Sequence, residues 1–167
     1  IDKAGNKSDV KEITIDKTTP QIKTYADGRE FNGEHTKASN ITFETIEDVG
    51  ILETVIKRNG YKFAGSLRNI EENGMYEIYV VDLAGNKSET RTVTLDNEKP
   101  KINVLGEKQP KDGILRINAD VIFEVIDNLD QSPKVFIKKD PGEFKQITQR
   151  AIIEDGEYEL YAEDKCG

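Results

Sequence analysis

One short motif occurs three times in this chain, and the spacing of its copies constrains the fold more than any other feature. The motif reads IDKAGNKS at 1–8 and VDLAGNKS at 81–88, and a third copy begins as EDKCG at 163–167. The first two copies are 80 residues apart and the last two are 82 apart. A period of this length is too long for a helical solenoid repeat and fits one small β-sandwich.

The repetition extends well beyond this motif. Three further pairs of segments match, the first two at an offset of 80 and the third at 82: 13–22 with 93–102, 43–48 with 123–128, and 74–79 with 156–161. The second repeat therefore carries two extra residues, which we expect to lie within the proline-containing segment 132–142.

These offsets predict the division of the chain. We expect a segment of a tandem array that is out of phase with its repeats. Residues 1–15 are predicted to be the last strand of a preceding repeat, 16–96 the first sandwich and 97–167 the second. The second sandwich is predicted to be incomplete, because the chain stops at the turn before its last strand.

Alternating apolar residues predict short strands and no convincing helix. Ile41–Ile46 alternates, Asn59-Gly60 is a hairpin signal, and residues 76–81 form the strongest strand pattern. Phe43 and Phe123 are expected core residues. One repeat contains seven such strands, so the predicted fold class is all-β, with two tandem immunoglobulin-like β-sandwiches.

Two tyrosines resemble the tyrosine corner of immunoglobulin domains. Tyr76 and Tyr158 each follow a turn and precede by two residues the expected core residues Ile78 and Leu160. The alternative, that they are ordinary strand residues, stays open. The core disulfide and tryptophan are missing, which excludes an antibody-type domain.

Composition and charge exclude several functional classes. The net charge of −8 and the scattered lysines and arginines argue against nucleic-acid binding. No apolar stretch approaches the ~18 residues of a membrane span, so no membrane insertion is expected. The only cysteine, Cys166, excludes an internal disulfide framework.

Signals of catalysis are nearly absent, and no enzymatic activity is predicted. The single histidine, His35, lies in a polar segment and is expected to be solvated. There is no phosphate-binding loop, nucleophile motif or spaced Cys/His cluster. Cys166 is expected to be a small hairpin residue rather than a reactive thiol.

The sequence Asp-x-Ala-Gly-Asn followed by Ile-Asp-x-x-x-Pro-x-Ile resembles the bacterial immunoglobulin-like (Big-type) repeats of surface and secreted proteins, common in Gram-positive bacteria. The resemblance covers essentially the whole chain, and Cys166 departs from it, since alanine stands there in the other copies. The matching positions are Asp82, Ala84, Gly85, Asn86, Asp96, Pro100 and Ile102, with Asp2, Ala4, Gly5, Asn6, Asp16, Pro20 and Ile22.

This resemblance implies an extracellular location, anchored in the cell wall or secreted. It implies a non-catalytic spacer or presentation module, with a role in adhesion left open, whose partners are the neighbouring repeats of the same polypeptide. The alternative is an accessory module that binds glycan or host protein beside a secreted hydrolase. Sugar binding needs exposed aromatic rings, and the candidates are Tyr25, Phe31, Tyr61 and Phe144.

Two readings of the Asp-x-Ala-Gly-Asn motif stay open. In the first it is only a turn, in which Gly85 supplies a positive φ while Asp82 and Asn86 bond nearby backbone. No cofactor is then required. In the second, carboxylates from linker and loops converge on Ca²⁺, which takes six to eight oxygen ligands. The candidate ligands are Asp16, Glu47, Asp48 and Asp82 at the first junction and Asp96, Asp127, Asp130 and Asp164 at the second.

The phase of the repeats also predicts contact between molecules. Residues 7–15 carry apolar side chains at Val10, Ile13 and Ile15 and resemble 90–95. We expect them to fill the place of the last strand in the second sandwich of a neighbouring molecule, head to tail.

Overall fold

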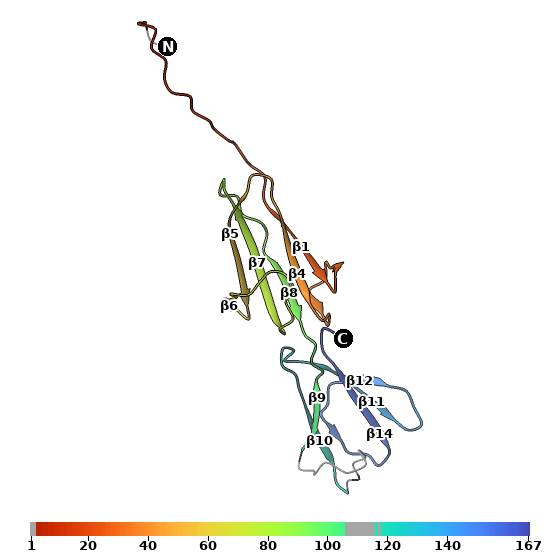
Figure 1. The fold of residues 1–167 in the computed structure, drawn as a ribbon. Coiled ribbons are helices and arrows are strands. Elements are labelled where there is room, and N and C mark those ends of the chain that lie inside the picture. The colour runs from red at the N-terminus through yellow and green to blue at the C-terminus, as the bar shows by residue number, and fades with distance from the viewer. Residues whose placement is uncertain (1–2, 106–115, 117) are drawn as a thin grey trace.

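The computed structural model describes residues 3–105, 116 and 118–167. All regular structure in these residues is β-strand, and they contain no helix, as the sequence predicts. The strands up to residue 95 and those from residue 101 onward form separate groups, because no sheet contains strands of both. Figure 1 shows the two groups following one another, with an extended segment before the first.

The first group has eight strands in two sheets. One sheet has the order β2-β1-β4 and the other β3-β8-β7-β5-β6, and only β3 and β8 pair in parallel. The bounds are β1 (Gln21–Ala26), β2 (Arg29–Glu30), β3 (His35–Thr36), β4 (Ile41–Ile46), β5 (Ile51–Arg58), β6 (Tyr61–Lys62), β7 (Gly74–Asp82) and β8 (Arg91–Leu95).

These two sheets enclose an apolar core, which makes the group sandwich-like. Successive side chains of a strand point to opposite faces, and in β7 every second residue from Gly74 to Asp82 is buried. Phe43 of β4 is buried, as the sequence predicts. The buried core residues are Ala38, Ile41, Phe43, Ile56, Ile70, Tyr76, Ile78, Val93 and Leu95.

The described residues of the second group form six strands, again in two sheets. Their orders are β13-β10-β9 and β12-β11-β14. Phe123 and Val135 are buried between them, whereas Leu160 remains partly exposed. The bounds are β9 (Lys101–Val104), β10 (Val121–Ile126), β11 (Lys134–Lys139), β12 (Lys145–Ile147), β13 (Ala151–Ile152) and β14 (Tyr158–Glu163).

The repeat pattern places most strands correctly and misses the shortest. β4 has the predicted bounds, and Asn59 and Gly60 form the predicted turn with φ of 51° and 82°. Residues 66–70 form no strand, since Ile70 makes only an isolated bridge. The polar segment between β1 and β4 contains β2 and β3, which are two residues each.

The N-terminal segment 3–15 belongs to neither group. It runs away from the first group as extended chain (Figure 1) and contains no strand. Val10, Ile13 and Ile15 are 88%, 82% and 79% exposed. Residues 3–15 therefore do not form the strand expected over 1–15.

Candidate metal sites at the two junctions

Three carboxylates gather where the chain enters the first group. Asp16 lies in the segment before β1, Glu47 follows β4, and Asp82 ends β7. One carboxylate oxygen from each residue lies within 4.8 Å of those from the other two. The linker and two separate loops thus meet at one end of the sandwich-like group, as the sequence predicts.

The same arrangement recurs where the chain enters the second group. Asp96 follows β8, Asp127 follows β10 and Asp164 follows β14. Their oxygens again lie within 4.8 Å of one another. These residues stand 80, 80 and 82 positions after Asp16, Glu47 and Asp82, so the repeat reproduces the group as well as the strands.

Backbone hydrogen bonds hold several of these carboxylates by one oxygen. The Asp16 Oδ1 accepts a 2.9 Å bond from the Thr18 N–H, and the Asp96 Oδ1 accepts a 3.0 Å bond from the Glu98 N–H. The Oδ1 of Asp164 accepts a 2.7 Å bond from the Cys166 N–H. Because the bonds come from the chain immediately following, each carboxylate is oriented by its own loop.

The second oxygen of Asp16 and that of Asp127 have a different environment. Each of these Oδ2 atoms is buried and receives no hydrogen bond. The Asp127 Oδ1, by contrast, accepts a 2.7 Å bond from the Asp130 N–H. A buried, ionised oxygen without a partner is costly, and such groups call for an unseen water or ion. Both atoms occur inside the two acidic groups, which makes these groups candidate cation sites.

The pKa values of two of these aspartates, Asp82 and Asp96, are shifted in opposite directions. Burial opposes ionisation of Asp82, but hydrogen bonds from Asn86 and turn amides outweigh it, so the pKa of Asp82 is lowered. Burial raises the pKa of Asp96, and the negative charges of Asp127 and Asp164 add to this effect. A cation held between the three aspartates would remove this repulsion.

The hydrogen bonds of the repeated motif fit its turn reading. The Asn86 N–H and side-chain amide donate 2.8 Å bonds to the two carboxylate oxygens of Asp82, and Gly85 has a φ of 92°. The same Asn86 side chain donates a 3.3 Å bond to the Asp16 carbonyl. Asp82 therefore belongs to both the turn and the acidic group, and the two readings are not exclusive.

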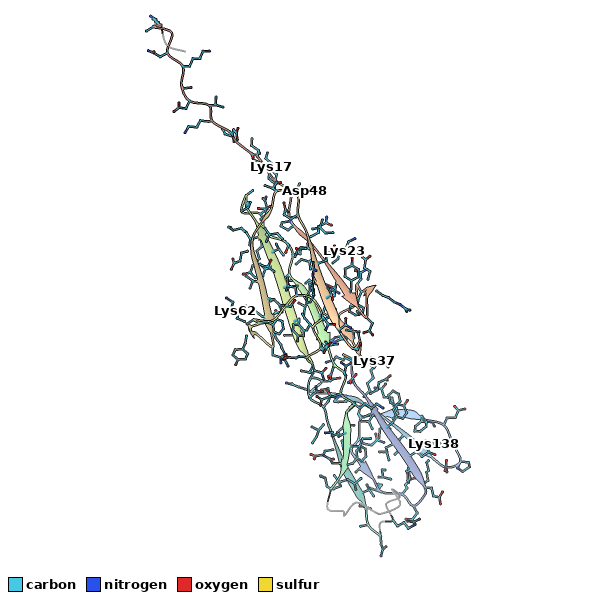
Figure 2. The ribbon with its side chains drawn as sticks, viewed as in Figure 1. Lys17, Lys23, Lys37, Asp48, Lys62 and Lys138 are labelled. Carbon is cyan, nitrogen blue, oxygen red and sulfur yellow. The ribbon has the colours of Figure 1, made fainter. Side chains whose placement is uncertain are left out.

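Two of the eight predicted ligands lie outside these groups. Asp48 is exposed in the loop between β4 and β5 (Figure 2). Asp130 is 6% exposed and bonds elsewhere, to the Ser132 N–H at 3.0 Å and to Lys165 Nζ at 3.1 Å. Sequence proximity in a loop does not fix the direction of a side chain, and these two carboxylates lie apart from the others.

One residue that contacts the second group of carboxylates was not predicted from the sequence. Asn128 occupies the position equivalent to Asp48, and its side-chain amide donates a 3.1 Å bond to the Asp96 Oδ1. An amide in place of a carboxylate at this repeat position was the available signal. It supports the linker aspartate without adding negative charge.

The residues considered for catalysis are poorly placed for it. His35 is exposed in β3. Burial, with the charges of Asp164 and Asp96, raises the pKa of Cys166 to about 11, which disfavours the reactive thiolate.

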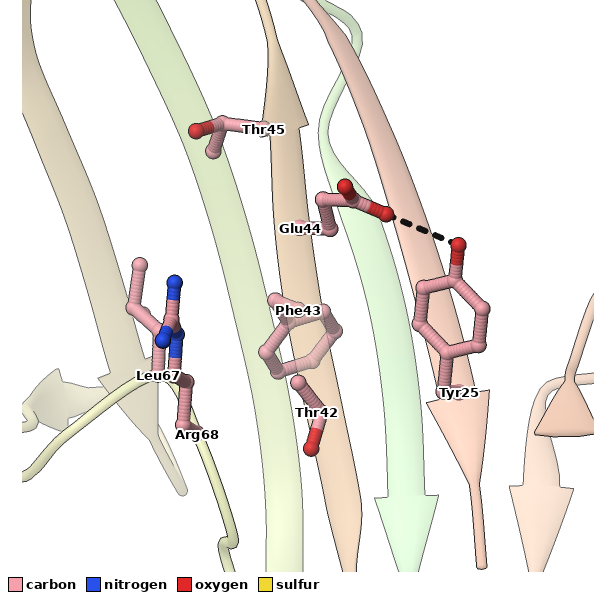
Figure 3. A pocket seen from close by; sticks show the side chains of 7 residues that line it. All are labelled: Tyr25, Thr42, Phe43, Glu44, Thr45, Leu67 and Arg68. Carbon is pink, nitrogen blue, oxygen red and sulfur yellow. Dashed lines mark hydrogen bonds between the residues drawn. The ribbon is translucent and has the colours of Figure 1, made fainter. Parts of the chain in front are cut away.

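A shallow hollow of about 490 Å³ lies over β1 and β4. Within it the Tyr25 hydroxyl donates a 2.8 Å bond to Glu44 (Figure 3), which raises the pKa of that tyrosine. The residues that line the hollow are Tyr25, Thr42, Phe43, Glu44, Thr45, Leu67 and Arg68. They include no histidine, cysteine or second carboxylate, so the hollow offers no catalytic pair.

Among the aromatic candidates for sugar stacking, two are committed elsewhere. Tyr25 bonds Glu44, and Phe31 packs against the first core. Tyr61 is 81% exposed. Phe144 meets Tyr161 edge to face at 5.0 Å, and Tyr161 stacks on Phe136 at 4.7 Å. The outer face of the β12-β11-β14 sheet therefore carries an aromatic cluster of Phe136, Phe144 and Tyr161.

No protein-family model, curated protein or solved structure matches the chain. Across the described ranges, no helix has the length and apolar character needed to cross a membrane.

Proposed function

We propose that this chain is a non-catalytic spacer of a bacterial cell-wall or secreted protein, built from tandem immunoglobulin-like modules and open to a role in adhesion. The support is the resemblance of the repeated motif to bacterial surface modules and the two sandwich-like groups that follow one another. Residues 16–96 form the first module and 97–167 the second. The task of the spacer is to hold other parts of a larger protein at a distance.

Calcium is proposed as the ion that stiffens the rod formed by successive modules. The observation that carries this is the buried, unpartnered Oδ2 of Asp16 and of Asp127, each inside a group of three carboxylates. Three carboxylates supply up to six hard oxygens, and water completes the six to eight that Ca²⁺ takes. Mg²⁺ demands a tighter octahedron, so loops of this kind favour the larger ion.

An ion bound by the second group of three carboxylates would fix the linker to the module that follows. Asp96 lies on the linker, Asp127 follows a strand of one sheet and Asp164 follows a strand of the other. One cation therefore ties the linker to both sheets at once. Bending at the linker would break ligand bonds, so the rod stays straighter with the ion than without it.

Thermal unfolding with and without about 1 mM Ca²⁺ tests this proposal. A ligand that binds only the native state raises Tm. Asp127→Asn is expected to abolish the rise for the second module, and Asp16→Asn for the first. In EDTA both variants should be at least as stable as the wild type, because each removes a buried negative charge.

Asp155→Asn is the matched control, since Asp155 is exposed and outside both groups. It should keep the full response to calcium. Absence of a Tm rise in the wild type, or an unchanged rise in both junction variants, would reject the calcium sites.

A second candidate function is binding of glycan or host protein, favoured by the aromatic cluster of Phe136, Phe144 and Tyr161. Tyr161 and Phe144 are 43% and 42% exposed, enough for contact with a sugar ring. A glycan and host-protein binding screen with wild type and Tyr161→Ala tests it. Binding that Tyr161→Ala abolishes would support this function, and no binding to any probe would dismiss it.

A further inference from the structure

No strand of the described residues lies beside the outer edge of β14. In its sheet, ordered β12-β11-β14, β14 is the last strand among the described residues. The equivalent strand β7 pairs with β5 on one side and β8 on the other. An unpaired edge presents a row of backbone N–H and C=O groups to any extended segment that fits it.

The core beneath this edge is also less covered than its counterpart. Tyr76, Ile78 and Val80 of β7 are fully buried. The equivalent Tyr158 and Leu160 are only partly buried. In the first group β8 contributes the buried Val93 and Leu95, and no described strand fills this place in the second.

A segment of the same chain has the sequence required. Residues 7–15 read KSDVKEITI, and 87–95, which contain β8, read KSETRTVTL. Ile13 and Ile15 stand where Val93 and Leu95 stand, and both are among the most exposed apolar side chains of the described chain. Burying them against β14 would remove apolar surface from water on both partners.

We propose that residues 7–15 of a second copy of this chain add to the free edge of β14 as an antiparallel strand. The β7–β8 register pairs Tyr76 with Val93 and Ile78 with Arg91. Transferred by the repeat offsets, it pairs Tyr158 with Ile13 and Leu160 with Lys11 of the second copy. The backbone hydrogen bonds supply affinity and the two isoleucines supply the register.

Two side-chain contacts of the first group fit the same transfer. The Ser88 Oγ accepts a 3.0 Å bond from the Val80 N–H, and Ser8 is its equivalent. Lys87 Nζ lies 3.7 Å from the centre of the Tyr79 ring. The second copy's Lys7 would take this place over Tyr161, which is the equivalent of Tyr79.

Residues 7–15 at this edge come from a second molecule, because a copy's own residues 7–15 cannot reach its β14 in this register. Ile15 would lie opposite Gly156, at the start of β14. The other end of β14 lies at the junction, where Lys37 Nζ bonds the Gly167 carbonyl, so Gly156 is at the far end of the second group (Figure 1). The few residues from 16 to β1 span at most about 20 Å, too little to cross both groups.

The contact is head to tail, because each copy offers one donor segment and one acceptor edge. Such heterologous contacts extend into open chains unless the rotation closes a ring. Light scattering of the full 167-residue chain over a wide concentration range tests this. The average mass is expected to rise above the 18.8 kDa of one copy as concentration increases.

Two variants make the test specific. Ile13→Lys puts a charge on the face that would enter the core, while Thr14→Lys puts the same residue on the opposite face of the strand. Association should be lost in Ile13→Lys and kept in Thr14→Lys. Both sites lie outside the strands, so the two variants should have wild-type Tm and circular dichroism at low concentration.

Amide hydrogen exchange gives an independent readout at the acceptor. Exchange at β14 should slow as the wild-type concentration rises and should not slow in Ile13→Lys. A wild type that stays at 18.8 kDa throughout, an Ile13→Lys that associates like the wild type, or association without protection of β14 would each overturn the proposal.

Discussion

The Tyr76 hydroxyl donates a 2.7 Å hydrogen bond to the Glu72 carbonyl, four residues earlier in the chain. Tyr158 makes the same bond to the Glu154 carbonyl at 3.1 Å. The bond ties the start of β7, and likewise of β14, to the loop that leads into it. The tyrosine-corner geometry expected from the sequence is therefore confirmed at both positions.

Removing this hydroxyl should destabilise the first group. Tyr76 is fully buried, so Tyr76→Phe leaves the Glu72 carbonyl without this donor, and the expected loss is about 1 kcal/mol. Urea unfolding measures it. Tyr158→Phe is the matched comparison, and its loss should be smaller because water reaches the more exposed Glu154 carbonyl. Equal losses in both variants would contradict this reasoning.

Truncating equivalent core residues in the two groups of strands should show that each group unfolds in its own transition. Ile78→Ala creates a cavity in a closed core and should cost about 2–5 kcal/mol. Leu160→Ala should cost less, because Leu160 is already partly exposed. Calorimetry should show each variant lowering a different unfolding transition. A single transition lowered by both would mean that the groups unfold as one unit.

Asp27 predicts an acid-sensitive loop. Its carboxylate accepts bonds from the Ser39 hydroxyl at 2.6 Å and the Ser39 N–H at 2.9 Å, which lower the pKa of Asp27 below its ordinary 3.8. Stability from a lowered carboxyl pKa is complete above that ordinary value. It is lost as the pH falls through the lower pKa of the folded state.

Asp27→Ala should therefore lower stability at neutral pH and lose little more on acidification through this range. An NMR titration of the Asp27 carboxyl, with unfolding measured at each pH, checks both parts. A pKa at or above 3.8 would refute the assignment.

The buried carboxylate of Asp130 depends on Lys165. The Lys165 Nζ lies 3.1 Å from the Asp130 Oδ1, and Asp130 is nearly inaccessible to water. Lys165→Met should cost about 1 kcal/mol, because Lys165 itself is largely exposed and the pair is partly screened. Lys134→Met, at an exposed lysine of β11, is the control. A loss no larger than that of the control would show that the pair is unimportant.

The internal repeat explains why much of this fold was predictable. Strand β4 and the core positions of Phe43 and Phe123 follow from alternation that occurs twice in register. β2 and β3 could not be predicted, because two residues are too few to show any period.

The junction groups were predictable in part for the same reason. The positions of Asp16, Glu47 and Asp82 follow from where strands end, so the topology brings them together. The direction in which a loop aspartate points depends on its local hydrogen bonds. Asp127 and Asp130 lie in one loop, and their different hydrogen bonds become visible only in the structure.

The place of β8 has a mechanical consequence. The chain arrives at one end of the first group and β8 leaves at the other (Figure 1), so tension along the polypeptide pulls β8 lengthwise against β7. Their paired residues, from Gly74 opposite Leu95 to Ile78 opposite Arg91, are then loaded together in shear. A strand loaded in this way cannot peel off one hydrogen bond at a time, so the module yields only when the whole ladder gives way.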